Sequence, residues 1–434
     1  MPRETLAPTA MNLEESEKLR GPLQRLIDSG SRVNDLKPQR YWYPLSAATY
    51  DVEEILAAVD SLCSFRTTMW EKTREFEEHF SLHFGFAESI MVNSGSSADL
   101  VTAFAMIDPS VGGLSPGDEV LMPSLTWPTH IWSAMMAGLK VRFVDVDPTT
   151  LNIDMSDLEA KVSDRTRAIW LVHLMGNPCD MDAVGRISKT HGLVVAEDCC
   201  EALGAEYDGK PVGSFGMAGT FSFFFSHHIT TMEGGMVSCA DPALSDTLRL
   251  LRAHGWSRNT RYIEAGVPDG VDPRYAFLDW GFNLRPTELQ AAFGLIQLER
   301  APGFHHTRVR NAGRFSALLE PYADQLSMMQ VSPRAGCSWF AMPLTVSPDA
   351  AFTRDEIVAE LEAYGVETRP IMAGNLARHP VADRRPELGS IDMPGVDYVH
   401  RHGFYIGLHP FEDDDKIDRV GDVISGFIDR RNRN

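Results

Sequence analysis

Between residues 89 and 239 the chain alternates short apolar runs with segments of helical periodicity, and this alternation is the strongest constraint on its fold. Strands separated by helices favour right-handed β-α-β units and a mostly parallel sheet. The predicted strands begin at Ser89, Glu119, Val141, Ala168, Leu193, Thr220 and Gly235. The pattern therefore predicts an α/β domain with a doubly wound sheet, closed by a helix from Pro286 to Arg300.

The chain has room for more than one domain, because it contains 434 residues of which 44% are hydrophobic. We expect a polar N-terminal extension over residues 1–40, with a helix that starts near Asn12. A large domain over 41–300 and a smaller C-terminal α+β domain over 301–434 are expected to follow.

The net charge and the cysteine content limit which binding partners and which cellular compartment we expect. A formal net charge of -20 argues against a nucleic-acid or anionic-membrane partner. A local basic pocket can still bind a small anion. The six cysteines do not form the disulfide framework of a small secreted protein. There is no apolar signal core and no run long enough to span a bilayer, so we expect a cytoplasmic protein.

A Gly-Ser turn at Gly95 and Ser96 lies between a predicted strand and a predicted helix. Free backbone N–H groups and the helix dipole at such a turn suit a phosphate. Taken alone, the turn is better explained as an ordinary serine N-cap.

Two further residues follow predicted strands, at the edge where open α/β sheets bind ligands. Asp198 ends an apolar strand and could pair with a protonated pyridine nitrogen, although a helix N-cap is the simpler explanation. Trp127 could stack on a cofactor ring or be a core aromatic residue.

His227 and His228 form an adjacent pair within the segment Ser222–Gly235. Neighbouring histidines in a turn usually point apart, and no Cys/His partners lie at zinc-finger spacing, so we do not expect a metal site here. An imidazole can transfer protons, but a pair of this kind most often has no function by itself.

These motifs, together with Gly281-Phe-Asn283-Leu-Arg-Pro-Thr-Glu288, occur in the order found in the DegT/DnrJ/EryC1/StrS family of sugar aminotransferases. The chain resembles that family over about residues 40 to 430. The resemblance implies the aspartate-aminotransferase type of fold, pyridoxal phosphate (PLP) and a homodimer. In the family a lysine that tethers the cofactor as an imine stands at the position of His227. An imidazole cannot form that tether.

The string His227-His228-Ile-Thr resembles a branch of nucleotide-sugar 3-dehydratases within this family. That resemblance implies PLP and pyridoxamine phosphate (PMP) as cofactors, a nucleotide-linked 4-keto-6-deoxyhexose as substrate and L-glutamate as amine donor. The implied site consists of His227 as acid/base, Gly95, Ser96 and Ser222 at the phosphate, Asn283 at the partner's phosphate, Asp198 at the pyridine nitrogen, Trp127 at the ring face and Glu201 at the ring hydroxyl.

Some dehydratases of this branch work with a reductase and bind an iron–sulfur cluster through four cysteines, three of them in a late insertion. Cys199 and Cys200 are present here, but residues 251–282 contain no cysteine. Because four thiolates are required, we expect no cluster. The chain instead resembles the cluster-free enzymes that make 3-deoxy-4-keto sugars.

Three alternatives remain open at this stage. They are an aminotransferase that has lost its lysine, a dehydratase of a non-nucleotide substrate in natural-product biosynthesis, and a non-catalytic PLP-binding protein. Four arginines are candidates for a diphosphate or for the glutamate carboxylate, without a choice among them: Arg252, Arg258, Arg285 and Arg369.

Overall fold

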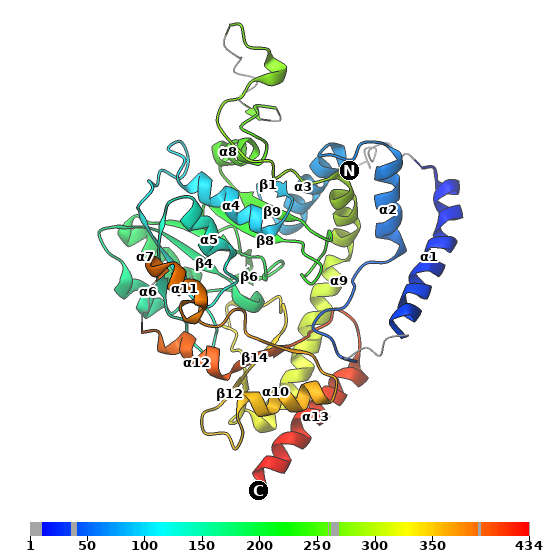
Figure 1. Cartoon of the computed structure of the whole chain (residues 1–434), viewed down its shortest axis with the longest axis vertical. Coiled ribbons are helices and arrows are strands. Elements are labelled where there is room, and N and C mark those ends of the chain that lie inside the picture. The colour runs from blue at the N-terminus through cyan, green and yellow to red at the C-terminus, as the bar shows by residue number, and fades with distance from the viewer. Residues whose placement is uncertain (1–10, 36–40, 259, 262–268, 389–391, 434) are drawn as a thin grey trace. The chain divides into compact units, whose positions relative to one another are not determined.

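The computed structural model describes residues 11–35, 41–258, 260–261, 269–388 and 392–433 (Figure 1). The described residues belong to two compact units. The first unit lies within 1–39, 48–114 and 217–301, and the second within 40–47, 115–216 and 302–434. This division cuts across the large domain expected over 41–300, and the expected domain boundaries stay a prediction.

The first unit contains three neighbouring strands, β1 (Glu88–Val92), β9 (Gly235–Cys239) and β8 (Ala218–Ser222). The middle strand, β9, is antiparallel to both of its neighbours. Helices α4 (Gly95–Met106) and α8 (Pro242–Arg252) contribute buried apolar side chains to the same core.

Three more helices belong to the first unit, namely α1 (Leu13–Asp35), α2 (Val52–Cys63) and α3 (Glu71–Phe84). The predicted N-terminal helix is confirmed as α1. Its Arg20 forms an ion pair with Glu53 on α2.

The second unit contains the parallel strands that the sequence predicts. They are β5 (Val194–Asp198), β4 (Thr166–Val172), β2 (Glu119–Pro123) and β3 (Lys140–Val144), in this spatial order. Successive strands are connected through α5 (Thr129–Met136), α6 (Met155–Lys161) and α7 (Met181–His191). Because all four strands run the same way, their carboxyl ends share one edge, where ligands bind in folds of this type.

The rest of the second unit is an α+β arrangement. Its four-stranded antiparallel sheet has the order β10 (Leu326–Met328), β12 (Met342–Val346), β14 (Gly403–Ile406) and β13 (Thr368–Pro370). The accompanying helices are α10 (Arg354–Ala363), α11 (Pro380–Arg384), α12 (Pro394–His402) and α13 (Asp414–Asn432). A small separate sheet contains β11 (Ala335–Gly336), β6 (Glu206–Tyr207) and β7 (Lys210–Pro211).

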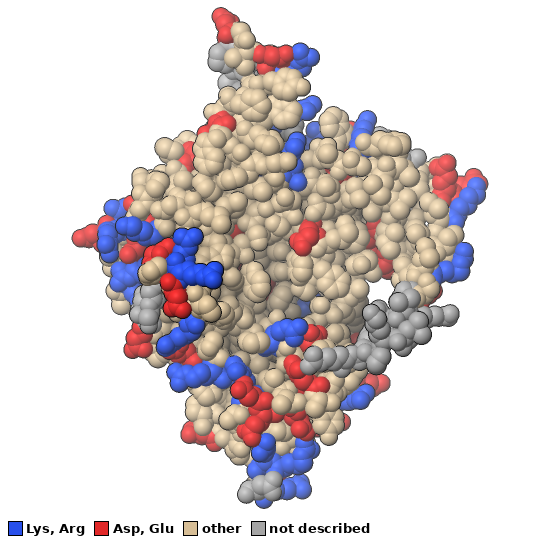
Figure 2. Space-filling view, in the orientation of Figure 1, with Lys and Arg blue, Asp and Glu red and all other residues tan. Residues whose placement is uncertain are grey.

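Helix α13 has charges arranged to suit its dipole. Asp414 and Asp415 lie in its first turn, and Arg430 and Arg431 lie in its last turn. The last turn forms part of the blue cluster near the C-terminus in Figure 2. No helix within the described ranges is both long and apolar enough to cross a membrane.

Two elements differ from the sequence-based expectation. Helix α9 (Glu288–Leu319) does not end at Arg300 but continues through Pro302, so the chain passes from one unit to the other inside a helix. A proline removes only one donor from a helix, and packing can outweigh that loss. Strand β8 begins at Ala218 and ends at Ser222, although the apolar run that predicts a strand from Thr220 continues to Phe225. The chain turns there, and the Phe223 N–H donates to the carbonyl of Gly234 at 2.9 Å.

Helix α3 is capped from a distance by Glu288, the first residue of α9. Trp70, which precedes α3, provides no side-chain cap. The Glu288 carboxylate accepts hydrogen bonds from the backbone N–H groups of Trp70 at 2.6 Å, Lys72 at 2.7 Å and Thr73 at 3.0 Å. Glu288 is only 2% exposed. It therefore satisfies two partly buried donors and one buried donor at the start of the helix, and its negative charge suits the helix N-terminus.

We predict that Glu288→Ala lowers the free energy of unfolding by about 2 kcal/mol or more, because several buried donors lose their acceptor. Urea denaturation followed by circular dichroism measures this change. The matched control is Glu387→Ala, whose side chain is 53% exposed and lies 3.9 Å from Arg385. It should change stability by no more than about 0.5 kcal/mol. Equal effects of the two substitutions would contradict the capping role.

Candidate active site

The turn between β1 and α4 brings Gly95 and Ser222 into contact. Ser94 caps α4, and its Oγ accepts a hydrogen bond from the Ser97 N–H at 3.1 Å. A Cβ placed on Gly95 would lie 2.5 Å from the Cβ of Ser222, so only glycine fits at this position. Ser96 is exposed in the first helical turn, which contains no acidic residue. This part of the first unit therefore suits a phosphate group.

The Gly-Gly pair at the start of β9 is also required by close packing, because side chains there would meet neighbouring atoms. A Cβ on Gly235 would lie 2.3 Å from the Ser94 carbonyl oxygen, and one on Gly234 would lie 2.1 Å from Thr231 Oγ1. Side chains at these positions would push β9 away from the Gly95 turn. The glycines thus fix the distance between that turn and the histidine segment.

His227 and His228 lie in a loop that two backbone hydrogen bonds close. The N–H of Thr231 donates to the carbonyl of Phe223 at 2.9 Å, beside the Phe223–Gly234 bond. His227 is partly exposed, whereas His228 is only 6% exposed. The two imidazoles therefore have different environments, and only His227 has a side chain open to a bound molecule.

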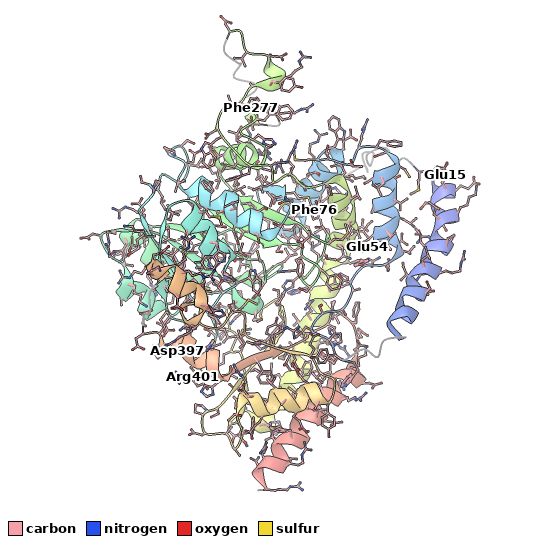
Figure 3. The ribbon with its side chains drawn as sticks, in the orientation of Figure 1. Glu15, Glu54, Phe76, Phe277, Asp397 and Arg401 are labelled. Atoms are coloured by element: carbon pink, nitrogen blue, oxygen red, sulfur yellow. The ribbon has the colours of Figure 1, made fainter. Side chains whose placement is uncertain are left out.

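Gln297 of α9 holds the far side of this loop, a role that the sequence did not reveal. Its side-chain oxygen accepts from the Thr230 N–H at 3.2 Å, and its amide nitrogen donates to Glu54 at 2.7 Å. Gln297 and Glu54 are both completely buried, and Glu54 is labelled in Figure 3. Nothing in the local sequence marks Gln297, because its partners lie far away along the chain.

Asn283 lies on an exposed segment next to the same turn. Its Oδ1 accepts a hydrogen bond from Arg285 Nε at 3.0 Å. The carbonyl of the adjacent Leu284 accepts from the Asn93 N–H at 3.0 Å. The segment is thus tied to the start of the Gly95 turn while the Asn283 side chain is exposed.

In the second unit, Asp198 and Trp127 follow the carboxyl ends of β5 and β2, which flank β4. Asp198 is 5% exposed, and its carboxylate accepts from the Cys200 N–H at 2.9 Å. The Trp127 side chain is 63% exposed, which excludes the core-aromatic alternative. Both residues therefore lie at the ligand-binding edge of the parallel strands.

His130 is a neighbour of Asp198 that the sequence analysis missed. Its Nδ1 lies 3.7 Å from the Asp198 carboxylate and 3.2 Å from Thr126 Oγ1. Complete burial lowers the pKa of His130, and this outweighs the opposing effect of Asp198. The imidazole is therefore neutral at pH 7 and adds no charge beside the carboxylate.

Glu201 is a buried carboxyl group whose pKa is raised to about 8, mainly by burial. Asp198 raises this pKa further, whereas a 2.9 Å hydrogen bond from the Met175 N–H opposes the shift. At pH 7 Glu201 therefore carries a proton that it can donate in a hydrogen bond.

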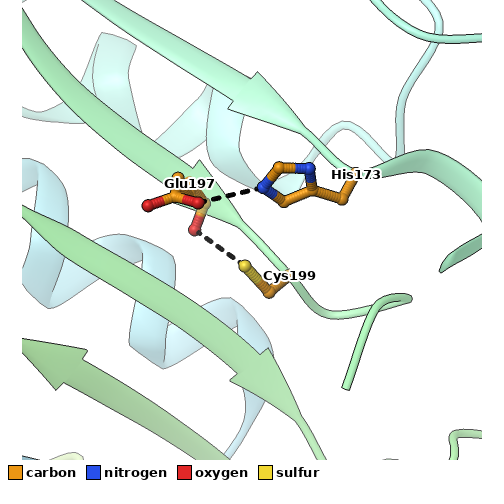
Figure 4. Close-up of side chains that lie close together, drawn as sticks. All are labelled: His173, Glu197 and Cys199. Atoms are coloured by element: carbon orange, nitrogen blue, oxygen red, sulfur yellow. Dashed lines mark hydrogen bonds and ion pairs between the residues drawn. The ribbon is translucent and has the colours of Figure 1, made fainter. Parts of the chain in front are cut away.

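His173, Glu197 and Cys199 lie close together in the second unit and are all buried (Figure 4). His173 Nδ1 accepts from the Cys179 N–H at 3.0 Å, so the proton is on Nε2, which donates to Glu197 at 3.0 Å. The Glu197 carboxylate also accepts three backbone N–H bonds, each of 2.7 Å, from residues 213, 215 and 216. With these atoms already occupied, the cluster is a structural network and not a metal site.

The four candidate arginines differ in their burial and in their ion pairs. Arg252 is 3% exposed and its guanidinium contacts Glu77 at 2.5 Å, so its role is structural. Arg369 pairs with Glu367 at 2.8 Å. Arg258 and Arg285 form no ion pair within the described part of the chain.

Comparison with known proteins identifies the class. A model of the DegT/DnrJ/EryC1/StrS aminotransferase family matches residues 49–425, and the chain belongs to this family. It is 35% identical to a GDP-4-keto-6-deoxy-D-mannose 3-dehydratase of Yersinia pseudotuberculosis, over 88% of this chain and 98% of that protein. It is also 35% identical to a dTDP-4-dehydro-2,6-dideoxy-D-glucose 3-dehydratase of Saccharopolyspora spinosa, over 88% and 86%.

The fold is shared as well. A crystal structure of GDP-4-keto-6-deoxymannose-3-dehydratase with a trapped PLP-glutamate geminal diamine superposes with a TM-score of 0.82. The sequence identity is 33%, and the match covers 88% of this chain and all of that one. The α/β fold is therefore that of PLP-dependent aminotransferases, as the sequence predicts.

The pKa of Glu201 predicts a pH dependence of stability. A carboxyl group whose pKa is raised by folding contributes most at low pH, and this contribution is lost as pH rises towards about 8. In Glu201→Gln this loss is absent, because the amide mimics the neutral acid. The variant should therefore gain unfolding temperature relative to the wild type at pH 9 but not at pH 5. Thermal denaturation without added cofactor measures the difference, and a pH-independent effect would reject the raised pKa.

Proposed function

We propose that this protein catalyses the PLP/PMP-dependent 3-dehydration of a nucleotide-linked 4-keto-6-deoxyhexose, with L-glutamate regenerating PMP. The observation that carries the proposal is the His227-His228-Ile-Thr string in a chain that belongs to this family, because the resemblance implies that His227 stands where relatives have the cofactor lysine. The similarity to 3-dehydratases of GDP- and dTDP-linked sugars over most of the chain supports the same reaction.

The residues fit PLP and PMP in chemical type. Gly95, Ser96 and Ser222 surround a helix N-terminus suited to the phosphate, and Asp198 is a carboxylate suited to a pyridinium nitrogen. Glu201 has a proton to share with the ring hydroxyl, and the exposed indole of Trp127 suits the ring face. The resemblance to the family assigns these residues to PLP and PMP.

When bound, PMP supplies an amine for the C4 ketone and a ring that accepts an electron pair. His227 would take a proton from the cofactor methylene carbon, and the same imidazolium would return a proton to the hydroxyl that leaves C3. Overall, the sugar loses the C3 oxygen, glutamate becomes 2-oxoglutarate and ammonia is released. Without a lysine at this position, no residue competes with the substrate for the cofactor.

We further propose a homodimer in the cytoplasm. Large apolar side chains are exposed between residues 275 and 280, namely Tyr275, Phe277 and Trp280, and Phe277 is labelled in Figure 3. A second copy of the chain would cover them, as large exposed apolar patches usually mark an interface. All six cysteines are free thiols, which suits a reducing compartment.

The reaction is tested by incubating the protein with PLP, glutamate and a panel of GDP-, dTDP- and CDP-linked 4-keto-6-deoxy sugars. We expect mass spectrometry to detect the 3-deoxy product with one of them. His227→Asn should abolish its formation, whereas His228→Asn, a change at the buried neighbour, should keep most of the activity. Amination without deoxygenation would favour the aminotransferase alternative. Equal loss in both variants would reject His227 as the acid/base.

We also predict that Asn283 serves the cofactor phosphate of the partner subunit. Asn283→Ala and His227→Ala subunits, each nearly inactive alone, are mixed after reversible dissociation. A mixed dimer should then contain one site with both defects and one with neither, which restores up to half of the activity of that dimer. No recovery in dimers shown to be mixed by differential tagging would place Asn283 and His227 in the same site.

A further inference from the structure

Arg308 of α9 is a buried cation that the proposed reaction does not use. It is only 5% exposed, and it forms no ion pair with a carboxylate within the described ranges. Burial lowers the pKa of its guanidinium to about 10, so the group stays charged at pH 7. Burying a charge without a counter-ion is costly, so the hydrogen bonds of this guanidinium must replace those it would form with water.

The hydrogen bonds of Arg308 go to three backbone carbonyls. Its Nη1 donates to the carbonyl of Leu408 at 2.6 Å, of Phe340 at 3.0 Å and of Trp339 at 3.3 Å. Leu408 follows β14, whereas Trp339 and Phe340 precede the neighbouring strand β12. Because hydrogen bonds from a charged donor are stronger than neutral ones, Arg308 orders the backbone of Trp339 and Phe340.

The ordered backbone is bonded in turn to the tight turn that follows β4. The N–H of Phe340 donates to the carbonyl of Met175 at 3.0 Å, and that of Ser338 donates to the carbonyl of Gly176 at 3.0 Å. A Cβ on Gly176 would lie 2.6 Å from the backbone nitrogen of Trp339, so only glycine fits between the two segments. Met175 and Trp339 have φ values of 54° and 51°. Residues with a side chain keep this conformation where the surrounding contacts impose it.

The same turn binds Glu201. The N–H of Met175 donates to the Glu201 carboxyl group at 2.9 Å. A continuous series of hydrogen bonds therefore leads from Arg308 through the peptide groups of Phe340 and Met175 to Glu201, and all four residues belong to the second unit. Each bond in such a series polarises and orients the next.

We propose that Arg308 is a positioning residue that holds the carboxyl group of Glu201 in place through Phe340 and Met175. This role rests on the proposed function only for the contact between Glu201 and the ring hydroxyl of PLP, because the series of hydrogen bonds lies in the chain itself. Arg308 acts by fixing the position of Glu201, since burial, the Met175 N–H and Asp198 are what shift the pKa of that group.

The first measurement uses the protein without cofactor. In the wild-type background Glu201→Gln should raise the unfolding temperature at pH 9 but not at pH 5. In an Arg308→Gln background we expect this gain to fall to about half or less, because a Glu201 side chain released from Met175 reaches water and titrates nearer its ordinary pKa. Thermal denaturation of the four proteins at both pH values gives a double-mutant cycle.

The other titratable groups that face Glu201 are the same in all four proteins. Asp198 raises the pKa of Glu201, and the Tyr405 phenol is neutral up to high pH because burial and the nearby Glu201 raise its own pKa to about 12. Neither group is altered by the substitutions. A difference between the two backgrounds therefore reports the position of Glu201.

Two further variants keep the test valid if Arg308→Gln does not fold. Gly176→Ala leaves Arg308 intact but pushes the Trp339 backbone away, so it should reduce the gain in the same way. Arg308→Lys keeps a cationic donor without the planar fork and should retain part of the gain. The matched control on the same helix is Arg314→Gln, whose side chain is 36% exposed and pairs with Asp418 at 2.5 Å. It should leave the gain unchanged, and circular dichroism checks that each variant is folded.

The second measurement is a pH titration of the absorbance of PLP added to the protein, which depends on the ionisation of the ring hydroxyl. Arg308→Gln should shift the midpoint in the same direction as Glu201→Ala does, and Arg308→Lys should shift it less. Arg314→Gln should not shift it. If Arg308→Gln and Gly176→Ala both keep the full pH-dependent gain and the wild-type midpoint, Arg308 has no positioning role. The inference is also wrong if Glu201→Gln gives no pH-dependent gain in the wild-type background.

The outcomes distinguish this inference from the proposed reaction. A gain that depends on Arg308, in a protein that dehydrates no sugar of the panel, would keep the coupling between Arg308 and Glu201 and reject the reaction. Dehydration of a nucleotide sugar by a protein whose gain is the same in both backgrounds would keep the reaction and reject the positioning role.

Discussion

The buried carboxylate of Glu197 is the constraint on which the carboxyl end of β5 in the second unit depends. It has no access to water, so each of its oxygens must be satisfied by protein donors. Three backbone N–H groups and His173 supply them. These bonds fix the end of β5. Because side chains alternate along a strand, fixing Glu197 on one face directs Asp198 to the other.

In the first unit the equivalent constraint is steric. Gly95 and Gly235 let the turn after β1, the end of β8 and the start of β9 approach within contact distance. Gln297 then holds the histidine loop from its other side through Thr230. The position of His227 is therefore set by close backbone packing and by one buried amide, neither of which takes part in proton transfer itself.

The charge of the groups near Asp198 depends on local burial and not on the formal net charge of -20 of the whole chain. Burial raises the pKa of Glu201 and lowers the pKa of His130, so both of these neighbours of Asp198 are neutral at pH 7.

The sequence by itself determined the alternation of strands and helices and the family, because these depend on local pattern and on motif order. It did not determine the roles of Gln297 and His130, because Thr230, Glu54 and Asp198 lie far from them in the sequence. It also left the candidate arginines undistinguished. Only the tertiary structure separated Arg252 from Arg258, because burial and the nearest carboxylate decide whether a guanidinium is structural or available to a ligand.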